Sequence, residues 1–421
     1  MVWVRLVELF LRRLFLVGKN IWIINQYAST PETGMGGRHY YLAKELAKQG
    51  HKVYLIAAGY THLLRSPLKF SEAFKVESVD SFQFVWINMP KYNGAHDKKR
   101  ILNWFLFAWK VLRLPKIISE NSDIILASSP SLLTFLGAKN LANKFKAKLA
   151  FEVRDIWPLT LIEIGGYSTK HPFIRFLQWI EDKAYKDADV VISNLPNADE
   201  HMAERGMNKN KFHWIANGLD IEEVSNSQPL PESILDSFPK DKLIIGYLGT
   251  LGEVNALEYF IESAKIKKDD DSIAWVLVGD GKEKKNLKNK VKNLELSNVF
   301  FVDPVSKNQV QSILKLFDIC YIGWRDKPGY RFGIAAQKIP EYMYSGRPII
   351  HSFSGYSDVV QKSNSGITVP AEDPLEVVRA LEVLKDMGKE KREELGENGH
   401  EYAVNNYDYK SLANRLLKVL T

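Results

Sequence analysis

The feature that most constrains this chain is an alternation of short apolar runs, glycine-bearing loops and helical segments that repeats along most of its length. The first apolar run, Asn20–Asn25, is followed by the loop Thr33–Gly37 and by a helical segment at about Arg38–Gln49. A second apolar run follows at His51–Ala58. This order predicts a βαβ unit, because parallel strands need a long crossover between them. Further strands are predicted at residues 123–127, 148–153 and 189–193.

The same alternation starts again after a polar, proline-containing stretch at residues 224–240, which we interpret as an interdomain linker. At 421 residues the chain is too long for one ordinary hydrophobic core, so two domains are expected. A helix is predicted at residues 256–265. Strands are predicted at residues 243–248, 275–278, 298–302, 319–323 and 348–352. The pattern therefore predicts an α/β chain of two Rossmann-like, doubly wound domains with ligands at the carboxyl ends of their strands.

Charge is distributed unevenly along the chain. The net formal charge is +7, but residues 1–150 hold 22 Lys and Arg against 9 Asp and Glu. A basic first half suggests an anionic partner, which could be nucleic acid, an anionic membrane or a phosphorylated acceptor, although a solvated basic surface is the alternative. Cys320 is the single cysteine, and its apolar neighbours indicate a buried thiol. A reducing, cytoplasmic location fits that composition.

Two segments of the basic half combine apolar and basic residues. Residues 1–17 are apolar but broken by four charges, which favours an amphipathic helix on a membrane over a spanning helix or a signal peptide. Residues 98–110 place four aromatic side chains beside Lys and Arg, as at a water–bilayer boundary. A buried core helix would explain the second segment equally well. Together the two segments predict a peripheral protein on the inner face of the plasma membrane.

Three glycine-bearing loops follow predicted strands in the second half of the chain: Gly249–Gly252, Gly279–Lys282 and Gly323–Asp326. Glycine lets a backbone approach a phosphate closely, although turns between strands and helices also need glycine for steric reasons. Lys338 and Glu341 lie three residues apart on a predicted helix and so share one face. The ammonium suits a phosphate and the carboxylate suits ribose hydroxyls, whereas the alternative is a surface ion pair of little energetic value.

The motifs and their spacing resemble the retaining glycosyltransferases of family 4, which have the GT-B fold, and especially the bacterial branch that builds surface polysaccharides. The Glu-Val-Arg-Asp-Ile-Trp-Pro segment at residues 152–158 looks like that of enzymes that handle N-acetylated amino sugars. The resemblance runs from Asn20 across nearly the whole chain. It rests on these pieces, in order: Gly36-Gly37, Ser128-Ser129-Pro130, residues 151–158, residues 188–193, Asn217-Gly218-Leu219-Asp220, residues 278–281 and residues 338–348.

The resemblance implies a division of labour between two domains that face one another across a cleft. Residues 1–225 would bind the acceptor, residues 241–404 would bind the nucleotide sugar, and residues 405–421 would form a helix that returns to the first domain. Glu341 matches the glutamate that holds the donor ribose. The glycines that match diphosphate-binding positions are Gly36, Gly37, Gly249, Gly252, Gly279 and Gly281.

The chain departs from the family pattern at three places. Gly333 stands where many members have a glutamate, and Arg154 stands where many have a histidine. The basic residue expected after the diphosphate loop is replaced by Glu253, Val254 and Asn255. We therefore predict Lys338, Asp155 and Arg154 as the catalytic group, with Lys338 stabilising the diphosphate. A structural pair of Arg154 with Asp155 is the alternative.

The predicted reaction transfers a sugar from a nucleoside diphosphate, expected to be UDP, to a lipid-diphosphate-linked saccharide. No metal-ligand spacing such as H-E-x-x-H occurs, and Asp269-Asp270-Asp271 resembles a solvated loop, so neither a metal nor another cofactor is expected. Two rival functions remain open. A sugar-nucleotide epimerase would have a similar two-domain fold. A basic nucleic-acid-binding protein is the other rival, but no nucleic-acid-binding module is evident and nucleic acid is not an expected partner.

Overall fold

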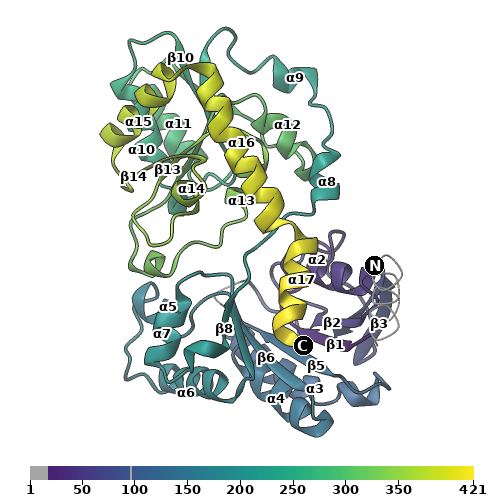
Figure 1. Cartoon of the computed structure of the whole chain (residues 1–421). Coiled ribbons are helices and arrows are strands. Elements are labelled where there is room, and N and C mark those ends of the chain that lie inside the picture. Colours follow the sequence, from purple (N-terminus) through teal and green to yellow (C-terminus); the bar gives the residue numbers. More distant parts are fainter. Residues whose placement is uncertain (1–17, 95–96) are drawn as a thin grey trace, which may run out of the picture. The chain divides into compact units, whose positions relative to one another are not determined.

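The computed structural model describes residues 18–94 and 97–421, and the chain divides into two compact units (Figure 1). The first unit contains the described residues up to Asn194, together with Asp199–Ile215 and Ala413–Thr421. The second unit contains Leu195–Ala198 and Ala216–Leu412. The last helix, α17 (Tyr409–Leu420), therefore contributes residues to both units. The predicted amphipathic helix at residues 1–17 lies outside the described residues.

Among the described residues, the first unit has an eight-stranded sheet with the order β3-β4-β2-β1-β5-β6-β7-β8. β3 pairs antiparallel with β4, and the other neighbouring strands pair in parallel. The strands are β1 (Asn20–Ile24), β2 (Lys52–Ala58), β3 (Phe74–Val79), β4 (Phe82–Ile87), β5 (Ile124–Ser128), β6 (Lys148–Val153), β7 (Val190–Ser193) and β8 (Phe212–Trp214). The helices are α2 (Arg38–Lys48), α3 (Lys99–Val111), α4 (Leu133–Phe145), α5 (Leu159–Glu163), α6 (Pro172–Asp187) and α7 (Ala198–Glu204).

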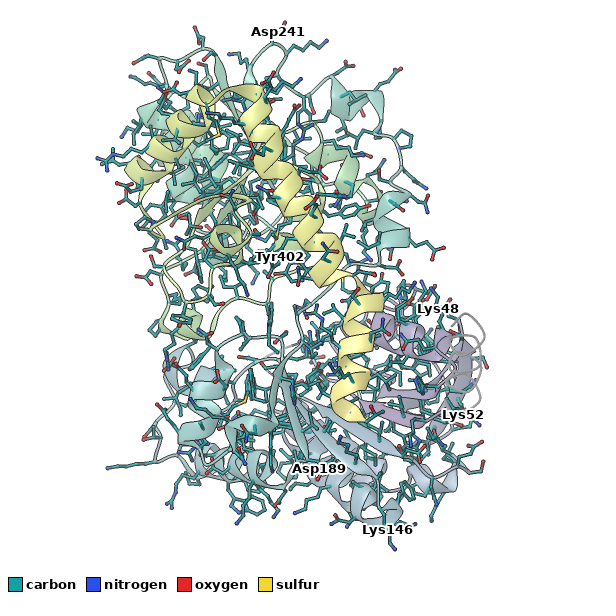
Figure 2. The ribbon with its side chains drawn as sticks, viewed as in Figure 1. Lys48, Lys52, Lys146, Asp189, Asp241 and Tyr402 are labelled. Carbon is teal, nitrogen blue, oxygen red and sulfur yellow. The ribbon has the colours of Figure 1, made fainter. Side chains whose placement is uncertain are left out.

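The central strands of this sheet are buried because helices cover both faces, which explains their nearly continuous apolar sequences. Trp22 on β1 packs edge to face against Phe145 at the end of α4, with ring centroids 5.4 Å apart. Polar side chains fix the ends of elements. Asp189, labelled in Figure 2, accepts a hydrogen bond from the Leu149 backbone N–H at 2.8 Å. Lys146 ends α4 in the left-handed conformation, with φ of 56°.

The second unit has a six-stranded parallel sheet within the part of the chain that the structure describes, with the order β11-β10-β9-β12-β13-β14. Its core includes Tyr247, Phe260, Trp275 and Tyr321, all fully buried. The strands are β9 (Leu243–Leu248), β10 (Ile273–Val278), β11 (Val299–Val302), β12 (Ile319–Gly323), β13 (Ile349–Ser352) and β14 (Gly366–Val369). The helices are α8 (Ile221–Ser225), α9 (Glu232–Leu235), α10 (Leu257–Ile266), α11 (Lys284–Asn293), α12 (Val310–Leu314), α13 (Lys338–Tyr344), α14 (Val359–Lys362), α15 (Pro374–Asp386) and α16 (Gly388–Tyr407).

The boundary between the units falls at residues 215 and 216, earlier than the polar stretch at 224–240 that the sequence suggested as a linker. That stretch belongs to the second unit because its backbone is hydrogen-bonded there. The Gln228 backbone N–H donates to Asn308 O at 2.7 Å, and the Gln309 side chain donates to Pro229 O at 2.9 Å. Proline and polar residues thus mark a segment that follows the surface of the second unit.

Cys320 is buried in β12, and burial raises the pKa of its thiol to about 12. Within residues 18–94 and 97–421, no helix has the length and apolar character needed to cross a membrane.

Candidate active site

Two of the predicted glycine loops meet at the carboxyl ends of the neighbouring parallel strands β9 and β10. The Leu251 N–H donates to Asp280 O at 2.8 Å, and the Glu283 N–H donates to Leu251 O at 3.0 Å. A Cβ added to Gly279 would lie 2.0 Å from Gly249 O, and one added to Gly281 would lie 2.3 Å from Leu251 O. Gly279 and Gly281 are therefore required for the two loops to pack together.

Lys338, the first residue of α13, lies directly against the Gly249 loop. Its ammonium donates to the hydroxyl of Tyr247 at 3.0 Å and to the side-chain oxygen of Asn255. Both partners in turn donate to the same loop carbonyl, Thr250 O, at 2.7 Å and 2.8 Å. The lysine stem passes so close to Gly249 that an added Cβ there would lie 3.3 Å from Lys338 Cδ. The cation is thus fixed beside the loop that was predicted to hold a diphosphate.

The Lys338 ammonium has no carboxylate within ion-pair distance among the described residues, and two aromatic rings flank it. It lies 4.7 Å from the Tyr247 ring centroid and 5.1 Å from that of Trp324. Burial lowers the pKa of Lys338 to about 7, against the opposing effect of the Glu341 charge. A half-buried cation without a neutralising partner is typical of a binding site for an anion.

A chain of hydrogen bonds behind Trp324 fixes the orientation of its ring. The Trp324 indole N–H donates to His351 Nε2 at 2.9 Å, so that His351 Nδ1 carries the proton and donates to Asp358 at 2.9 Å. All three side chains are largely buried. The wall of the Lys338 site is therefore held from behind by a polar network.

Glu341 lies one turn after Lys338 on α13. Within the described part of the chain, no hydrogen bond or ion pair reaches its carboxylate, so the surface ion pair with Lys338 that the spacing allowed is absent. Burial raises the pKa of Glu341 to about 7, while the charges of Lys307 and Lys338 oppose that rise. A groove lined by Glu223, Lys307 and Gln311 adjoins the carboxylate. The Glu341 side chain is therefore half-buried, and its carboxylate oxygens are available to accept hydrogen bonds from a ligand.

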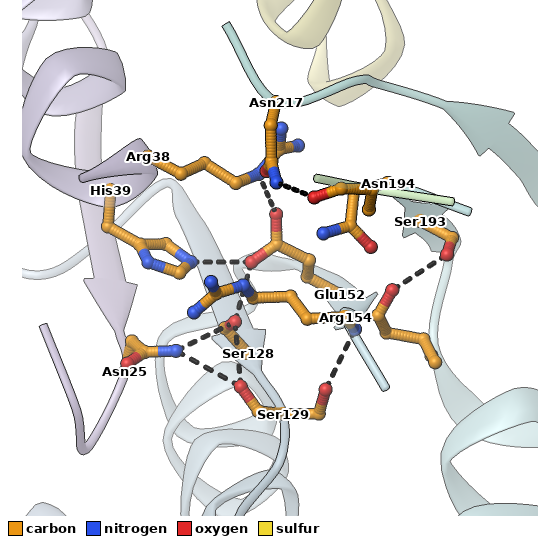
Figure 3. Close-up of polar contacts among 12 residues, drawn as sticks. Asn25, Arg38, His39, Ser128, Ser129, Glu152, Arg154, Ser193, Asn194 and Asn217 are labelled. Atoms are coloured by element: carbon orange, nitrogen blue, oxygen red, sulfur yellow. Dashed lines mark hydrogen bonds and ion pairs between the residues drawn. The ribbon is translucent and has the colours of Figure 1, made fainter. Parts of the chain in front are cut away.

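The first unit contains a second buried polar cluster, centred on Glu152 in β6 (Figure 3). Glu152 Oε1 accepts from Arg38 Nε at 2.6 Å, while Oε2 lies 2.5 Å from His39 Nε2 and accepts from the Ser128 hydroxyl at 2.5 Å. The Asn25 amide donates to Ser128 Oγ at 2.9 Å. This cluster lies at the carboxyl ends of β1, β5 and β6 and includes the first two residues of α2.

The charges in this cluster are balanced around one carboxylate. Burial alone would raise the pKa of Glu152, but the charges of His39, Arg38 and Arg154 together hold the pKa of that carboxyl well below its usual range. Burial lowers the pKa of His39, and the charges of Arg154 and Arg38 contribute to that lowering. We therefore assign an ionised Glu152 that accepts a hydrogen bond from His39 Nε2. Arg154 points toward this pair (Figure 3).

Asp155, the predicted partner of the sugar or acceptor, begins the turn after β6. Its two carboxylate oxygens accept from the Trp157 indole N–H at 2.7 Å and from the Thr160 hydroxyl at 2.6 Å. The backbone N–H of Arg154 donates to the Ser129 hydroxyl at 2.8 Å. The structure thus shows Asp155 holding the turn that carries it, and its contact with a substrate stays a prediction.

The other glycines differ in what their backbone requires. Gly36 and Gly37 have φ of 64° and 87°, in the left-handed region, and Gly37 caps the N-terminus of α2. Gly333 has φ of 89°, and a Cβ there would lie 2.5 Å from the Pro196 side chain. In this backbone conformation any side chain at position 333, including the glutamate common in the family, would be strained.

Sequence reasoning missed the residues that surround the predicted ones. It did not predict that Tyr247, Asn255 and Trp324 surround Lys338, because these residues come from separate strands and loops. It also missed Glu152 and His39 as a pair. A signal for Glu152 existed, since a carboxylate within the apolar strand at 148–153 must be paired to be buried. Within the described ranges, no group of three or more His, Cys, Asp or Glu side chains could hold a metal ion.

Comparison with known proteins identifies the class of protein to which this chain is similar. The family described as "Glycosyltransferase Family 4" matches residues 33–223, and the family described as "Glycosyl transferases group 1" matches residues 236–402. The "Putative colanic acid biosynthesis glycosyl transferase WcaI" of Escherichia coli (strain K12) is 23% identical in an alignment 369 residues long, which covers 84% of this chain and 88% of that protein.

Solved structures agree in fold. Sucrose-phosphate synthase (tll1590) from Thermosynechococcus elongatus superimposes with a TM-score of 0.69 at 15% identity, over 95% of this chain and 98% of that chain. Anabaena Alr3699/HepE in complex with UDP-glucose superimposes with a TM-score of 0.63 at 14% identity, over 96% and 99% of the two chains. The two largely parallel sheets and these matches define a glycosyltransferase with the GT-B fold. The chain belongs to the glycosyltransferases that the family 4 and group 1 descriptions cover.

Proposed function

We propose that this enzyme is a retaining glycosyltransferase that moves a sugar, of the N-acetylated amino sugar class, from UDP to a lipid-diphosphate-linked saccharide. The observation that carries the proposal is the Lys338 site: an ammonium without a carboxylate partner beside the Gly249 loop, with the acceptor-rich Glu341 carboxylate one turn away. HepE was solved with UDP-glucose and WcaI is named for colanic acid biosynthesis, which supports a UDP donor and a polysaccharide product. The amino sugar rests on the resemblance of residues 152–158.

The proposed reaction breaks the bond between the anomeric carbon and the β-phosphate oxygen. That oxygen leaves with the electron pair as UDP, and an acceptor hydroxyl bonds to the anomeric carbon and loses its proton. Lys338 and the backbone N–H groups of the Gly249–Gly252 loop stabilise the charge that develops on the diphosphate. Glu341 accepts from the ribose hydroxyls. In this proposal the enzyme's own residues stabilise the charge on the departing diphosphate, so the reaction requires no metal or other cofactor.

We assign the donor to the second unit and the acceptor to the first unit. In the first unit, Arg154 and the turn that contains Asp155 lie beside the Glu152 cluster at the carboxyl ends of the strands. In parallel sheets, ligands bind at those ends. Gly36 and Gly37 directly precede α2 beside the same cluster, and the N-terminus of a helix suits an anion.

Donor binding is expected to be strongest near pH 7 and weaker on both sides. Lys338 and Glu341 each have a pKa of about 7. Above pH 7 the Lys338 ammonium loses its proton and no longer neutralises the diphosphate. Below pH 7 the Glu341 carboxylate gains a proton and accepts hydrogen bonds from the ribose less well. Calorimetric titration with UDP-N-acetylglucosamine, whose diphosphate does not titrate in this range, measures the effect. Lys338→Met should remove the alkaline decline and Glu341→Gln the acid decline. A profile that both variants leave unchanged would contradict the assignment.

We also propose that helices α3 and α6 of the first unit contact an anionic membrane. Trp104 and Phe107 on α3 are buried in the core, but Phe105 and Trp109 remain 45% and 47% exposed. Phe105 stacks on Phe176 of α6, with ring centroids 6.0 Å apart, and Phe176 stacks on Trp179, which is 52% exposed. Arg113 lies over the Trp109 ring, 3.5 Å from its centroid. The other exposed basic residues on these two helices or close to their ends in sequence are Lys98, Lys99, Lys116 and Arg175. Aromatic rings and basic side chains together suit anionic headgroups.

The double variant Phe105→Ser/Trp109→Ser is expected to bind vesicles about tenfold more weakly, because the two rings no longer enter the headgroup region. Co-sedimentation with vesicles of phosphatidylglycerol, compared with phosphatidylcholine, measures the loss. Leu375→Ser, which removes an exposed apolar side chain from the second unit, is the matched control. Equal vesicle binding by the double variant and the control would refute the membrane assignment. Retention on immobilised DNA without vesicle binding would favour the nucleic-acid rival.

A donor screen tests the proposed function directly. Purified enzyme is incubated with a panel of sugar nucleotides, with and without bacterial lipid extract, and nucleoside diphosphate release is followed. We expect lipid-dependent release from one UDP-sugar and its loss in Glu341→Ala. Isomerisation of a sugar nucleotide without release would instead identify an epimerase, and no release from any donor would refute transfer.

A further inference from the structure

A cavity of about 450 Å³ lies in the first unit at the carboxyl ends of the parallel strands β2 and β4. It is separate from the Glu152 cluster, and none of the predicted site residues lines it. Its walls include Gly59, Leu68, Phe70, Asn88 and Met89. Ligands of parallel α/β sheets bind at this end of the strands, so the cavity is placed where a substrate would be expected.

Hydrogen bonds and close packing hold the cavity open. The Asn88 side chain, just after β4, donates to Phe70 O and to Glu72 O, both at 3.1 Å, and so fixes the loop that forms one wall. A Cβ added to Gly59 would lie 2.7 Å from the Phe70 ring, so glycine lets this ring reach its position. Lys110 on α3 donates to Asn88 O at 2.5 Å. The wall is thus tied to the helix that we assign to the membrane.

The lining combines apolar surface with positive charge. Leu68, Phe70 and Met89 provide the apolar part, and Lys69 and Lys91 are exposed at its edge. No acidic side chain lines the cavity in the part of the chain that the structure describes, and no ion pair there engages either lysine. Two cations beside an apolar wall fit a ligand that is an anion at one end and a hydrocarbon at the other.

We infer that this cavity binds the diphosphate of the lipid-linked acceptor together with the first carbon units of its lipid. Lys69 and Lys91 bind the phosphates, and Leu68, Phe70 and Met89 contact the hydrocarbon. The inference rests on the proposed function for the identity of the acceptor. The connection through Lys110 to α3 supports it, because a lipid acceptor must reach the site from the membrane surface.

Binding of geranyl diphosphate, a short soluble isoprenoid diphosphate, tests the cavity without requiring transfer. Calorimetric titrations are run with saturating UDP, so that the Lys338 site is occupied. We expect Lys69→Gln/Lys91→Gln to bind at least about tenfold more weakly than the wild-type enzyme, because two charge-assisted contacts are lost. Lys209→Gln, at an exposed lysine elsewhere in the first unit, should bind normally. Equal affinity of the double variant and this control would overturn the inference.

Two further ligands separate the contributions of the anion and the hydrocarbon. Geraniol lacks the diphosphate and inorganic pyrophosphate lacks the hydrocarbon, and each is expected to bind more weakly than geranyl diphosphate. Pyrophosphate that binds as tightly as geranyl diphosphate would overturn the lipid assignment and indicate a free-phosphate site.

Transfer kinetics distinguish failure of this inference from failure of the proposed function. The double lysine variant should raise KM for the lipid acceptor while leaving KM for the donor unchanged. An enzyme that transfers sugar with the same acceptor KM in the double variant and in Lys209→Gln overturns the cavity assignment only. If neither the wild-type enzyme nor any variant releases nucleotide, the proposed function is refuted. The titrations with geranyl diphosphate would still show whether the cavity binds an isoprenoid diphosphate.

Discussion

Replacement of Lys338 with methionine is expected to lower kcat/KM for sugar transfer by roughly 100- to 1000-fold, the usual cost of removing one donor that stabilises a developing anion. Methionine keeps the length of the side chain and its contact with Gly249 but removes the charge. The loss should appear in kcat as well as in KM for the donor, because Lys338 binds the diphosphate of the donor and the leaving oxygen carries still more charge in the transition state. Initial rates with the donor found in the screen measure it.

The fold of this variant should be at least as stable as that of the wild type. Burial lowers the pKa of Lys338 from 10.5 to about 7, so holding this lysine charged costs folding free energy. That cost is fully present below pH 7 and fades as the pH rises toward 10.5, where the unfolded chain also loses the proton. Lys268→Met, at an exposed lysine of the same unit, is the control and should change neither activity nor stability. A Lys338→Met enzyme with normal kcat would exclude Lys338 from the reaction.

Glu152→Ala is expected to lower the free energy of unfolding of the first unit by roughly 3–5 kcal/mol, as when one partner of a buried ion pair is removed. The substitution leaves the buried Arg38 guanidinium without the carboxylate that lies 2.6 Å from its Nε, and it removes the acceptor of Ser128 and His39. Urea denaturation followed by circular dichroism measures the change. Glu204→Ala, an exposed glutamate of the same unit, should stay within about 0.5 kcal/mol of the wild type.

The pH dependence provides a second measure of the same interaction. The pKa of Glu152 is depressed in the folded state, so its stabilising contribution is present above the ordinary pKa of 4.5 and is lost as the pH falls through and below that value. The wild type should therefore lose more stability on acidification than Glu152→Ala. Parallel curves for the two proteins would show that Glu152 is not held ionised by Arg38 and His39.

Much of the fold followed from local patterns. The apolar runs from Asn20 to Ser352 predicted nearly all the central strands, because a strand buried on both faces needs a continuous apolar sequence and a turn at each end. The hairpin of β3 and β4 was not predicted. Phe74–Val79 has polar and charged residues at the sheet edge, which hides a strand, but Phe82–Ile87 is an apolar and largely buried run that a local pattern does show. The linker prediction at 224–240 was misplaced, because the composition of a surface segment does not show to which unit its backbone is hydrogen-bonded.

What the sequence by itself determined is the class of the enzyme and the residues that its motifs contain, among them Gly249, Lys338 and Glu341. These signals are local, since spacing on one helix or one loop decides them. Only the tertiary structure decided which side chains surround them. Tyr247, Asn255 and Trp324 come together at Lys338 because the neighbouring parallel strands β9 and β12 end side by side. Arg38 meets Glu152 across 114 residues of sequence. The charge states follow from that assembly, because burial and neighbouring charges, rather than residue type, set the pKa values of Lys338, Glu341 and Glu152.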